Sequence, residues 1–254
     1  MANYFTQCSL HSSAEKPADA SGAVADVVHV WCASLSRPEE CYQRYRDSLS
    51  ADERQRAERF HFERDRRHFV VGRGILRALL ARYLGDEPNS LCFDYGPYGK
   101  PALGGAHKNQ LRFNLSHSHG LGLYAVAHGR EMGIDLEYVR PIAEMEQLAE
   151  RFFSTQENAI LRVVAAEQRA LAFFNCWTRK EAFIKACGEG LSMPLNRFTV
   201  SLTPGEPARL LSSDDGFQDG SRWCLRELAL PAGYVGALVV EGTHCELELR
   251  QWEN

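Results

Sequence analysis

The sequence lacks the patterns that mark secreted, membrane-spanning and nucleic-acid-binding proteins. No apolar run approaches the roughly 20 residues that a membrane-spanning helix needs. Residues 1–26 have neither the basic start nor the apolar stretch of a signal peptide. The 29 basic and 33 acidic residues give a net charge of -4, so no global positive field favours a nucleic-acid backbone or an anionic membrane. We therefore expect a cytoplasmic protein that binds neither nucleic acid nor membrane.

Several common functional motifs are also missing. The 8 cysteines include no Cys-x-x-Cys pair and no disulfide-rich spacing, which is typical of buried or idle thiols. The sequence contains no Gly-x-x-x-x-Gly-Lys loop, Gly-x-Gly-x-x-Gly fingerprint or Gly-x-Ser-x-Gly elbow. P-loop, dinucleotide-binding and α/β-hydrolase chemistry are therefore disfavoured.

What is present is a chain of 254 residues, 44% of them hydrophobic, which is enough to bury a substantial core.

The predicted order of a strand, helices, a long helix and short strands occurs twice, and the two long helices are expected to end at Gly85 and Gly188. We predict an α+β fold built by pseudo-twofold duplication. In each unit a long helix packs on a small, mostly antiparallel sheet, and the active site lies between the halves. The expected parts are a flexible tail at residues 1–26, an N-terminal half at 27–132 and a C-terminal half at 133–254.

Two carboxylates alternate along one predicted strand. In Gly-Ile-Asp-Leu-Glu-Tyr at residues 133–138, the strand period of two places Asp135 and Glu137 on the same face, roughly 7 Å apart. Such neighbours repel each other, and a divalent cation with oxygen ligands is one way to relieve the repulsion. The alternative is the solvated face of an edge strand, and this segment alone does not decide between them.

A third acid interrupts an apolar stripe of the second long helix. The helical period places Phe174, Trp177, Glu181 and Lys185 on one side. Burial of a carboxylate costs several kcal/mol unless it is paired or coordinated. Either an intrahelical ion pair with Lys185 or a metal ion would satisfy Glu181.

Candidate phosphate ligands lie elsewhere in the chain. Lys100 lies at the tip of the turn-rich Gly-Pro-Tyr-Gly-Lys-Pro stretch at residues 96–101, and His117 lies near the end of a strand at residues 113–118. Each has a structural alternative, an exposed turn lysine and a surface histidine. No Cys or His cluster completes a zinc site around His117.

Most arginines between Arg54 and Arg73 are interpreted as a solvated helix face. Acids, a lysine and scattered phosphate donors together favour phosphoryl chemistry, in which charge neutralisation and positioning supply most of the acceleration.

Four motifs occurring in order resemble the long, single-chain 4'-phosphopantetheinyl transferases of the surfactin-synthetase-activating type. They are Tyr-Gly-Lys-Pro at residues 98–101, Phe-Asn-Leu-Ser-His-Ser at 113–118, Gly-Ile-Asp-Leu-Glu at 133–137 and Trp-Thr-Arg-Lys-Glu-Ala-Phe-Ile-Lys at 177–185. The resemblance implies transfer of 4'-phosphopantetheine from coenzyme A to a serine of an acyl or peptidyl carrier protein. It also implies Mg2+ dependence, with Mn2+ as an alternative metal, and release of adenosine 3',5'-bisphosphate by a monomer.

The resemblance also implies roles for individual residues. Mg2+ ligands would be Asp135, Glu137 and Glu181, and catalytic roles would fall to Glu181, as base, and Lys185, at the pyrophosphate. The implied coenzyme A contacts are Arg56, Gly99, Lys100, Ser116, His117 and Lys185.

Two other functions use the same residues. A metal-dependent nucleotide hydrolase would cleave coenzyme A with water, without a carrier protein. A coenzyme A-binding regulator on a degenerate scaffold would have lost an acid or Lys185, and the sequence retains them all.

Overall fold

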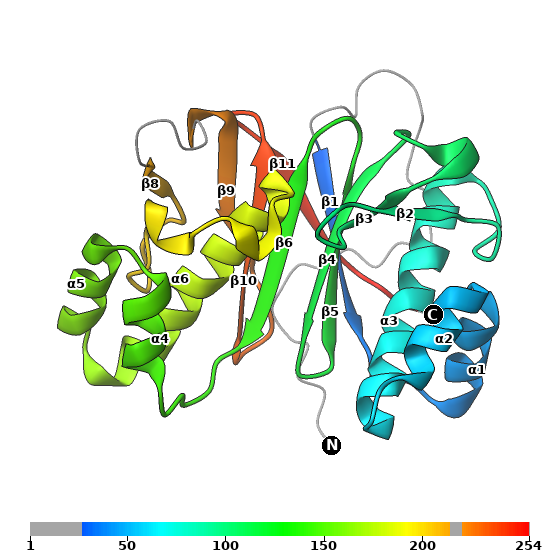
Figure 1. Ribbon diagram of the computed structural model, residues 1–254, viewed down its shortest axis with the longest axis horizontal. Helices are drawn as coiled ribbons and strands as arrows, with labels where there is room; N and C mark the ends of the chain where they lie inside the picture. Colours follow the sequence, from blue (N-terminus) through cyan, green and yellow to red (C-terminus); the bar gives the residue numbers. More distant parts are fainter. Residues whose placement is uncertain (1–26, 214–219, 254) are drawn as a thin grey trace.

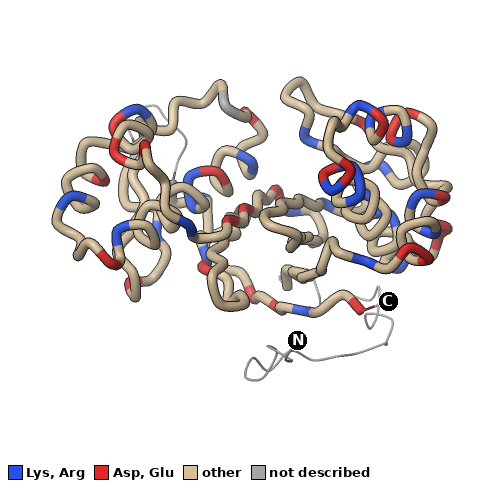
Figure 2. Tube along the Cα trace, turned by 90° about the horizontal axis from the view of Figure 1, so that it is seen from below, with Lys and Arg blue, Asp and Glu red and all other residues tan. Residues whose placement is uncertain are grey.

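The computed structural model describes residues 27–213 and 220–253, which form two sheets, each covered by helices on its outer side (Figure 1). The predicted tail at residues 1–26 lies outside the described residues. Acidic and basic positions are interspersed over both halves, in keeping with the small net charge (Figure 2). Among the residues described, no helix combines the length and the apolar character needed to cross a membrane.

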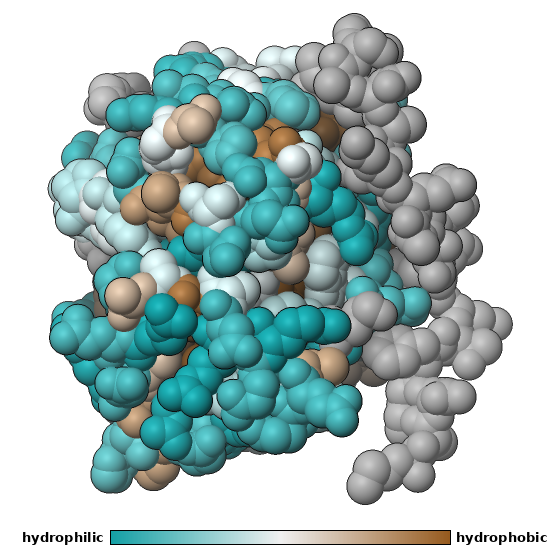
Figure 3. Space-filling model, turned by 90° about the vertical axis from the view of Figure 1, so that its right-hand side faces the viewer, coloured by the Kyte–Doolittle hydropathy of each residue, from teal (hydrophilic) through white to brown (hydrophobic). Residues whose placement is uncertain are grey.

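The first sheet has the strand order β11-β1-β5-β4, with β1–β11 parallel and the other pairs antiparallel. Helix α3 ends at Gly85, whose φ of 68° is readily adopted only by glycine. The outward face of these helices is mainly hydrophilic (Figure 3). The elements of this half are β1 (Val27–Ser34), α1 (Glu39–Ser48), α2 (Ala51–Glu58), α3 (Glu63–Leu84), β4 (Arg112–Ser118) and β5 (Leu121–Ala127), with a small β2–β3 ribbon (Phe93–Tyr95 and Pro101–Leu103) and the last strand β11 (Glu246–Gln251).

The second sheet has the order β6-β10-β9 and is antiparallel throughout. Its long helix α6 ends at Gly188, with φ 76°, as α3 does at Gly85. The elements are β6 (Met132–Tyr138), α4 (Met145–Phe152), α5 (Thr155–Val163), α6 (Ala166–Cys187), β9 (Trp223–Glu227) and β10 (Tyr234–Glu241), with a β7–β8 ribbon (Phe198–Val200 and Leu210–Ser213). Short 3-10 turns lie at Gly105–His107, Gly190–Ser192, Leu195–Arg197 and Gly220–Arg222.

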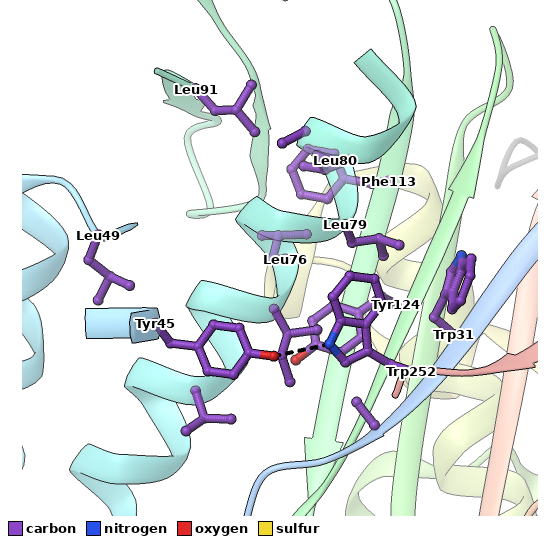
Figure 4. Packing of buried hydrophobic residues seen from close by; sticks show 14 of the residues in the cluster. Trp31, Tyr45, Leu49, Leu76, Leu79, Leu80, Leu91, Phe113, Tyr124 and Trp252 are labelled. Atoms are coloured by element: carbon purple, nitrogen blue, oxygen red, sulfur yellow. Dashed lines mark hydrogen bonds between the residues drawn. The ribbon is translucent and has the colours of Figure 1, made fainter. Parts of the chain in front are cut away.

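Three apolar cores hold these layers together. One lies between the first sheet and α3, another between the second sheet and α6, and the third between the two sheets. The last strand, β11, returns to pair with β1, and Trp252 beyond it enters the first core. There its indole N–H donates to the Tyr45 hydroxyl (3.1 Å, Figure 4). The end of the chain thus ties the second half to the first.

The duplication extends to a buried glutamate in each half. Glu53 and Glu157 close capping boxes with Ser50 and Ser154 at the starts of α2 and α5. Each carboxylate also forms ion pairs with basic residues of its long helix, Glu53 with α3 and Glu157 with α6. The predicted α+β duplication is confirmed, while the division at residues 27–132 and 133–254 stays a prediction.

Candidate active site

A cavity of about 460 Å³ lies between the two halves, a size common among small-ligand sites. Its walls come from α2, α3, the β2–β3 turn, β4 and the end of α6. Six predicted ligand-binding residues from separate segments line it, namely Arg56, Gly99, Lys100, Ser116, His117 and Lys185. The fold therefore brings these residues to one place.

The predicted metal ligands of β6 face β4 at one side of this cavity. The Ser116 hydroxyl donates to Asp135 Oδ1 (2.9 Å), and the Ser118 hydroxyl donates to Glu137 Oε2 (3.0 Å). Arg140 lies 3.4 Å from the same Glu137 oxygen. Asp135 is only 6% exposed, so its charge requires these polar partners.

Close packing of α6 on β6 brings Lys185 to Asp135. A Cβ atom on Gly133 would lie 2.1 Å from the Ala182 carbonyl oxygen, so only glycine permits this approach. Lys185 Nζ donates to Asp135 Oδ1 (2.7 Å) and to Ser116 Oγ (3.3 Å). The structure thus shows an ion pair between α6 and β6 in place of the intrahelical Glu181–Lys185 pair that the sequence left open.

Glu181 lies one turn before Lys185 and has no hydrogen bond or ion pair with another described residue. The pKa of Glu181 is raised to about 7, mainly by burial and also by the negative charges of Asp135 and Glu137, against the opposing effect of Lys185. Trp177, Glu181 and Lys185 are only partly buried, in contrast to the neighbouring residues of the helix. Of the stripe identified in the sequence, Lys185 lines the cavity, whereas Phe174 is buried and Trp177 packs against the core of this half.

Replacing Glu181 by glutamine should stabilise the metal-free protein at pH 8 by about 1 to 2 kcal/mol, after allowance for partial exposure. The folded-state pKa lies above the ordinary 4.5, so the destabilisation by Glu181 grows as pH rises from about 4.5 to 7 and is complete above that range. Urea unfolding with EDTA at pH 8 and pH 4.5 measures this, and the variant should match the parent at pH 4.5. An equal gain at both pH values would contradict the prediction.

The three acids supply the oxygen ligands that Mg2+ prefers, and the charges of Asp135 and Glu137 contribute to the raised pKa of Glu181. Across residues 27–213 and 220–253, no three His, Cys, Asp or Glu side chains are already gathered around one point. Asp135 is instead held by Lys185, and Glu137 by Ser118. The donor set fits Mg2+, and its side chains would have to close on the ion.

Other cavity residues were missed from the sequence: His68, Arg73, Tyr95, Tyr98 and Asn114. Arg73 is one of the arginines of which most were predicted to form a solvated helix face, yet it is 7% exposed and donates to Glu53 Oε1 (2.6 Å) and to the Tyr95 hydroxyl. Its neighbours in sequence, Val71 and Ile75, are buried, and this local apolar character was the available signal.

His117 is exposed in the cavity. Neighbouring atoms remove part of its hydration, which lowers its pKa, and the charge of Lys185 lowers it further. The imidazole is therefore mainly neutral at pH 7 in the empty cavity and can donate one hydrogen bond.

Comparison with known proteins defines the class of this site. Residues 131–239 match the 4'-phosphopantetheinyl transferase superfamily, and residues 36–129 match the family described as 4'-phosphopantetheinyl transferase, N-terminal. Both halves that form the cavity thus match the same class of transferase.

Two curated relatives give the same result. The 4'-phosphopantetheinyl transferase HetI of a Nostoc species is 45% identical over 86% of this chain and 90% of its own length. Sfp of Bacillus subtilis is 32% identical over 66% of this chain and 74% of its own. The holo-[acyl-carrier-protein] synthase of Thermotoga maritima, a solved structure, covers 45% of this chain and 64% of its own, with 24% identity and a TM-score of 0.34. The chain belongs to the 4'-phosphopantetheinyl transferase family of enzymes, which confirms the resemblance and enzyme class predicted from the motifs.

Proposed function

We propose that the protein transfers 4'-phosphopantetheine from coenzyme A to a serine of an acyl or peptidyl carrier protein, in a Mg2+-dependent reaction that releases adenosine 3',5'-bisphosphate. The main support for this proposal is the position of Lys185, which lines the cavity and forms an ion pair with Asp135. A cationic ligand for a pyrophosphate thereby adjoins a carboxylate suited to a metal ion.

The polar residues of the cavity would bind coenzyme A, the phosphopantetheine donor. Lys100, Lys185 and Arg56 would offer positive charge to the phosphates of coenzyme A, and Ser116 and the neutral His117 would offer hydrogen bonds. The backbone of Gly99, with φ 79°, forms the tight turn that leads to Lys100. The net charge of the whole chain is negative, so anion binding depends on this local group.

Asp135, Glu137 and Glu181 would hold the metal ion. Mg2+, or Mn2+ as an alternative, supplies neutralisation of charge on the pyrophosphate oxygens when bound. These acids lie on β6 and α6 outside the cavity lining, and Asp135 is joined to the lining through its contacts with Lys185 and Ser116.

The reaction forms a bond between the serine oxygen and the phosphorus of the phosphopantetheine moiety and breaks the pyrophosphate P–O bond. The serine proton would pass to Glu181, the carboxylate one helical turn before Lys185. Lys185 would stabilise the negative charge of the leaving adenosine 3',5'-bisphosphate. If Glu181→Gln keeps near-normal turnover at saturating Mg2+, this assignment of the base is wrong.

We also propose a cytoplasmic, monomeric enzyme. Both walls of the cavity come from one chain, so no second subunit is needed to complete the site.

The decisive experiment incubates the protein with coenzyme A and several apo-carrier proteins, with Mg2+ or with EDTA. We expect mass spectrometry to show one added phosphopantetheine group on a carrier only when metal is present. Coenzyme A cleavage without a carrier would indicate the hydrolase alternative. Coenzyme A binding without any mass shift would indicate the regulator.

A further inference from the structure

Lys100 is held at the cavity by contacts that reach across the two halves. Its backbone closes the tight β2–β3 turn, where Gly96 N donates to Lys100 O (3.0 Å). Its side chain extends to the start of β6, where Nζ donates to Met132 O (3.1 Å) and Glu131 Oε2 (3.2 Å). An ammonium group has three donors. Two of them fix the lysine, and one remains for the cavity that Lys100 lines.

Glu131 immediately precedes β6 and is shared between two cations. Its Oε1 lies 2.8 Å from Arg112 Nε, and its Oε2 faces Lys100. One carboxylate between two cations leaves a net charge of +1 in this group, because Arg112 already offsets the charge of Glu131. The glutamate therefore anchors Lys100 without cancelling the positive charge at the cavity.

These side chains are 23% exposed for Lys100, 33% for Arg112 and 43% for Glu131. Solvent screens ion pairs of this kind, so they contribute little to folding stability. A flexible lysine, however, loses much side-chain freedom when it is fixed. Because Glu131 fixes Lys100 in advance, this entropy cost does not weaken ligand binding.

We propose that Glu131 is a positioning residue for donor binding: it holds the Lys100 ammonium at the cavity wall, ready for a phosphate of the donor. Glu131 itself does not line the cavity and acts through Lys100. The inference rests on the proposed role of Lys100 in binding coenzyme A.

Steady-state kinetics with coenzyme A, Mg2+ and an apo-carrier test this role. Glu131→Gln should raise the KM for coenzyme A about 3- to 10-fold, with kcat within about twofold, because ground-state and transition-state binding are weakened alike. Lys100→Met should raise the KM at least as much. The double variant should match Lys100→Met, because Glu131 has no effect without the lysine. Calorimetric titration of coenzyme A provides the same comparison at equilibrium.

Glu241→Gln is the matched control. Glu241 lies at the same end of the second sheet, where its side chain pairs with Arg222 and accepts a bond from Glu131 N, with no contact to Lys100. This variant should leave the KM within about twofold.

The outcomes separate the two proposals. An unchanged KM in Lys100→Met would remove the proposed donor contact and the positioning role with it. A raised KM in Lys100→Met but not in Glu131→Gln, or independent effects that multiply in the double variant, would overturn the positioning role alone. A lower KM in Glu131→Gln would show that the glutamate competes with the donor, and would also overturn it.

Discussion

Replacing Asp135 by asparagine should lower the rate of phosphopantetheine transfer by ~10²- to 10³-fold, the scale for loss of a group that stabilises developing charge. The change removes the proposed metal ligand and the anionic partner of Lys185, which lies 2.7 Å away. The amide keeps the size of the carboxylate, so packing against Ser116 and α6 should be retained. Transfer to an apo-carrier at saturating coenzyme A, measured over a Mg2+ titration, checks this result.

Glu227 provides the matched control for Asp135. Both residues pair with Ala237 of β10, one from each side, and both form an ion pair with α6. The partner of Glu227 is Arg179, outside the cavity. Glu227→Gln should therefore keep near-normal transfer. Near-normal turnover of Asp135→Asn at saturating Mg2+ would contradict the proposed role of Asp135.

Local periodicity was sufficient to predict the elements that carry Asp135 and Glu181. The strand predicted from the alternation around Asp135 is observed as β6, and glycine ends both long helices as expected. Glu181, expected to interrupt an apolar stripe, is partly buried one helical turn before Lys185, which lines the cavity. These signals depend on neighbours within a few residues, where strand and helix periods apply.

Contacts between distant segments were not predictable in this way. Lys185 pairs with Asp135, 50 residues away, and not with Glu181 on its own helix. β11 joins the first sheet beside β1, at the opposite end of the chain. Most arginines between Arg54 and Arg73 were predicted to be solvated, yet Arg73 is buried and pairs with Glu53, 20 residues earlier. Partner choice at such separations depends on the folded arrangement, which no local period encodes.

Glu157 is the clearest case of a residue whose importance depends on distant partners. It is fully buried, and its oxygens accept bonds from the backbone N–H groups of Ser154 and Val200 (both 2.7 Å). Its Oε2 also lies 2.8 Å from Lys180 Nζ, and neither side chain is exposed. One carboxylate thus joins α5, the β7 strand and α6.

Glu157→Gln should reduce the free energy of unfolding by about 3 to 5 kcal/mol, because it leaves the buried charge of Lys180 without a counter-charge. The melting temperature should fall on the order of 10 °C. Equilibrium unfolding in urea and thermal melts measure both effects. Transfer at low temperature should be largely kept, because neither Glu157 nor Lys180 lines the cavity.

Glu150, which forms a surface ion pair with Arg162, is the control that tests whether burial of the pair causes this loss of stability. The two side chains are 64% and 68% exposed, so Glu150→Gln should change stability by less than about 1 kcal/mol. Adding Lys180→Met to Glu157→Gln should recover part of the lost free energy of unfolding, because it removes the uncompensated charge. The recovery should be partial, because the hydrogen bonds of Lys180 to the Leu195 and Phe198 carbonyls are also lost. If Glu157→Gln were as mild as Glu150→Gln, the buried pair would not stabilise this half. The ion pairs of Glu53 with α3 would then not be expected to stabilise the first half either, because Glu53 is a capping-box glutamate in the same arrangement.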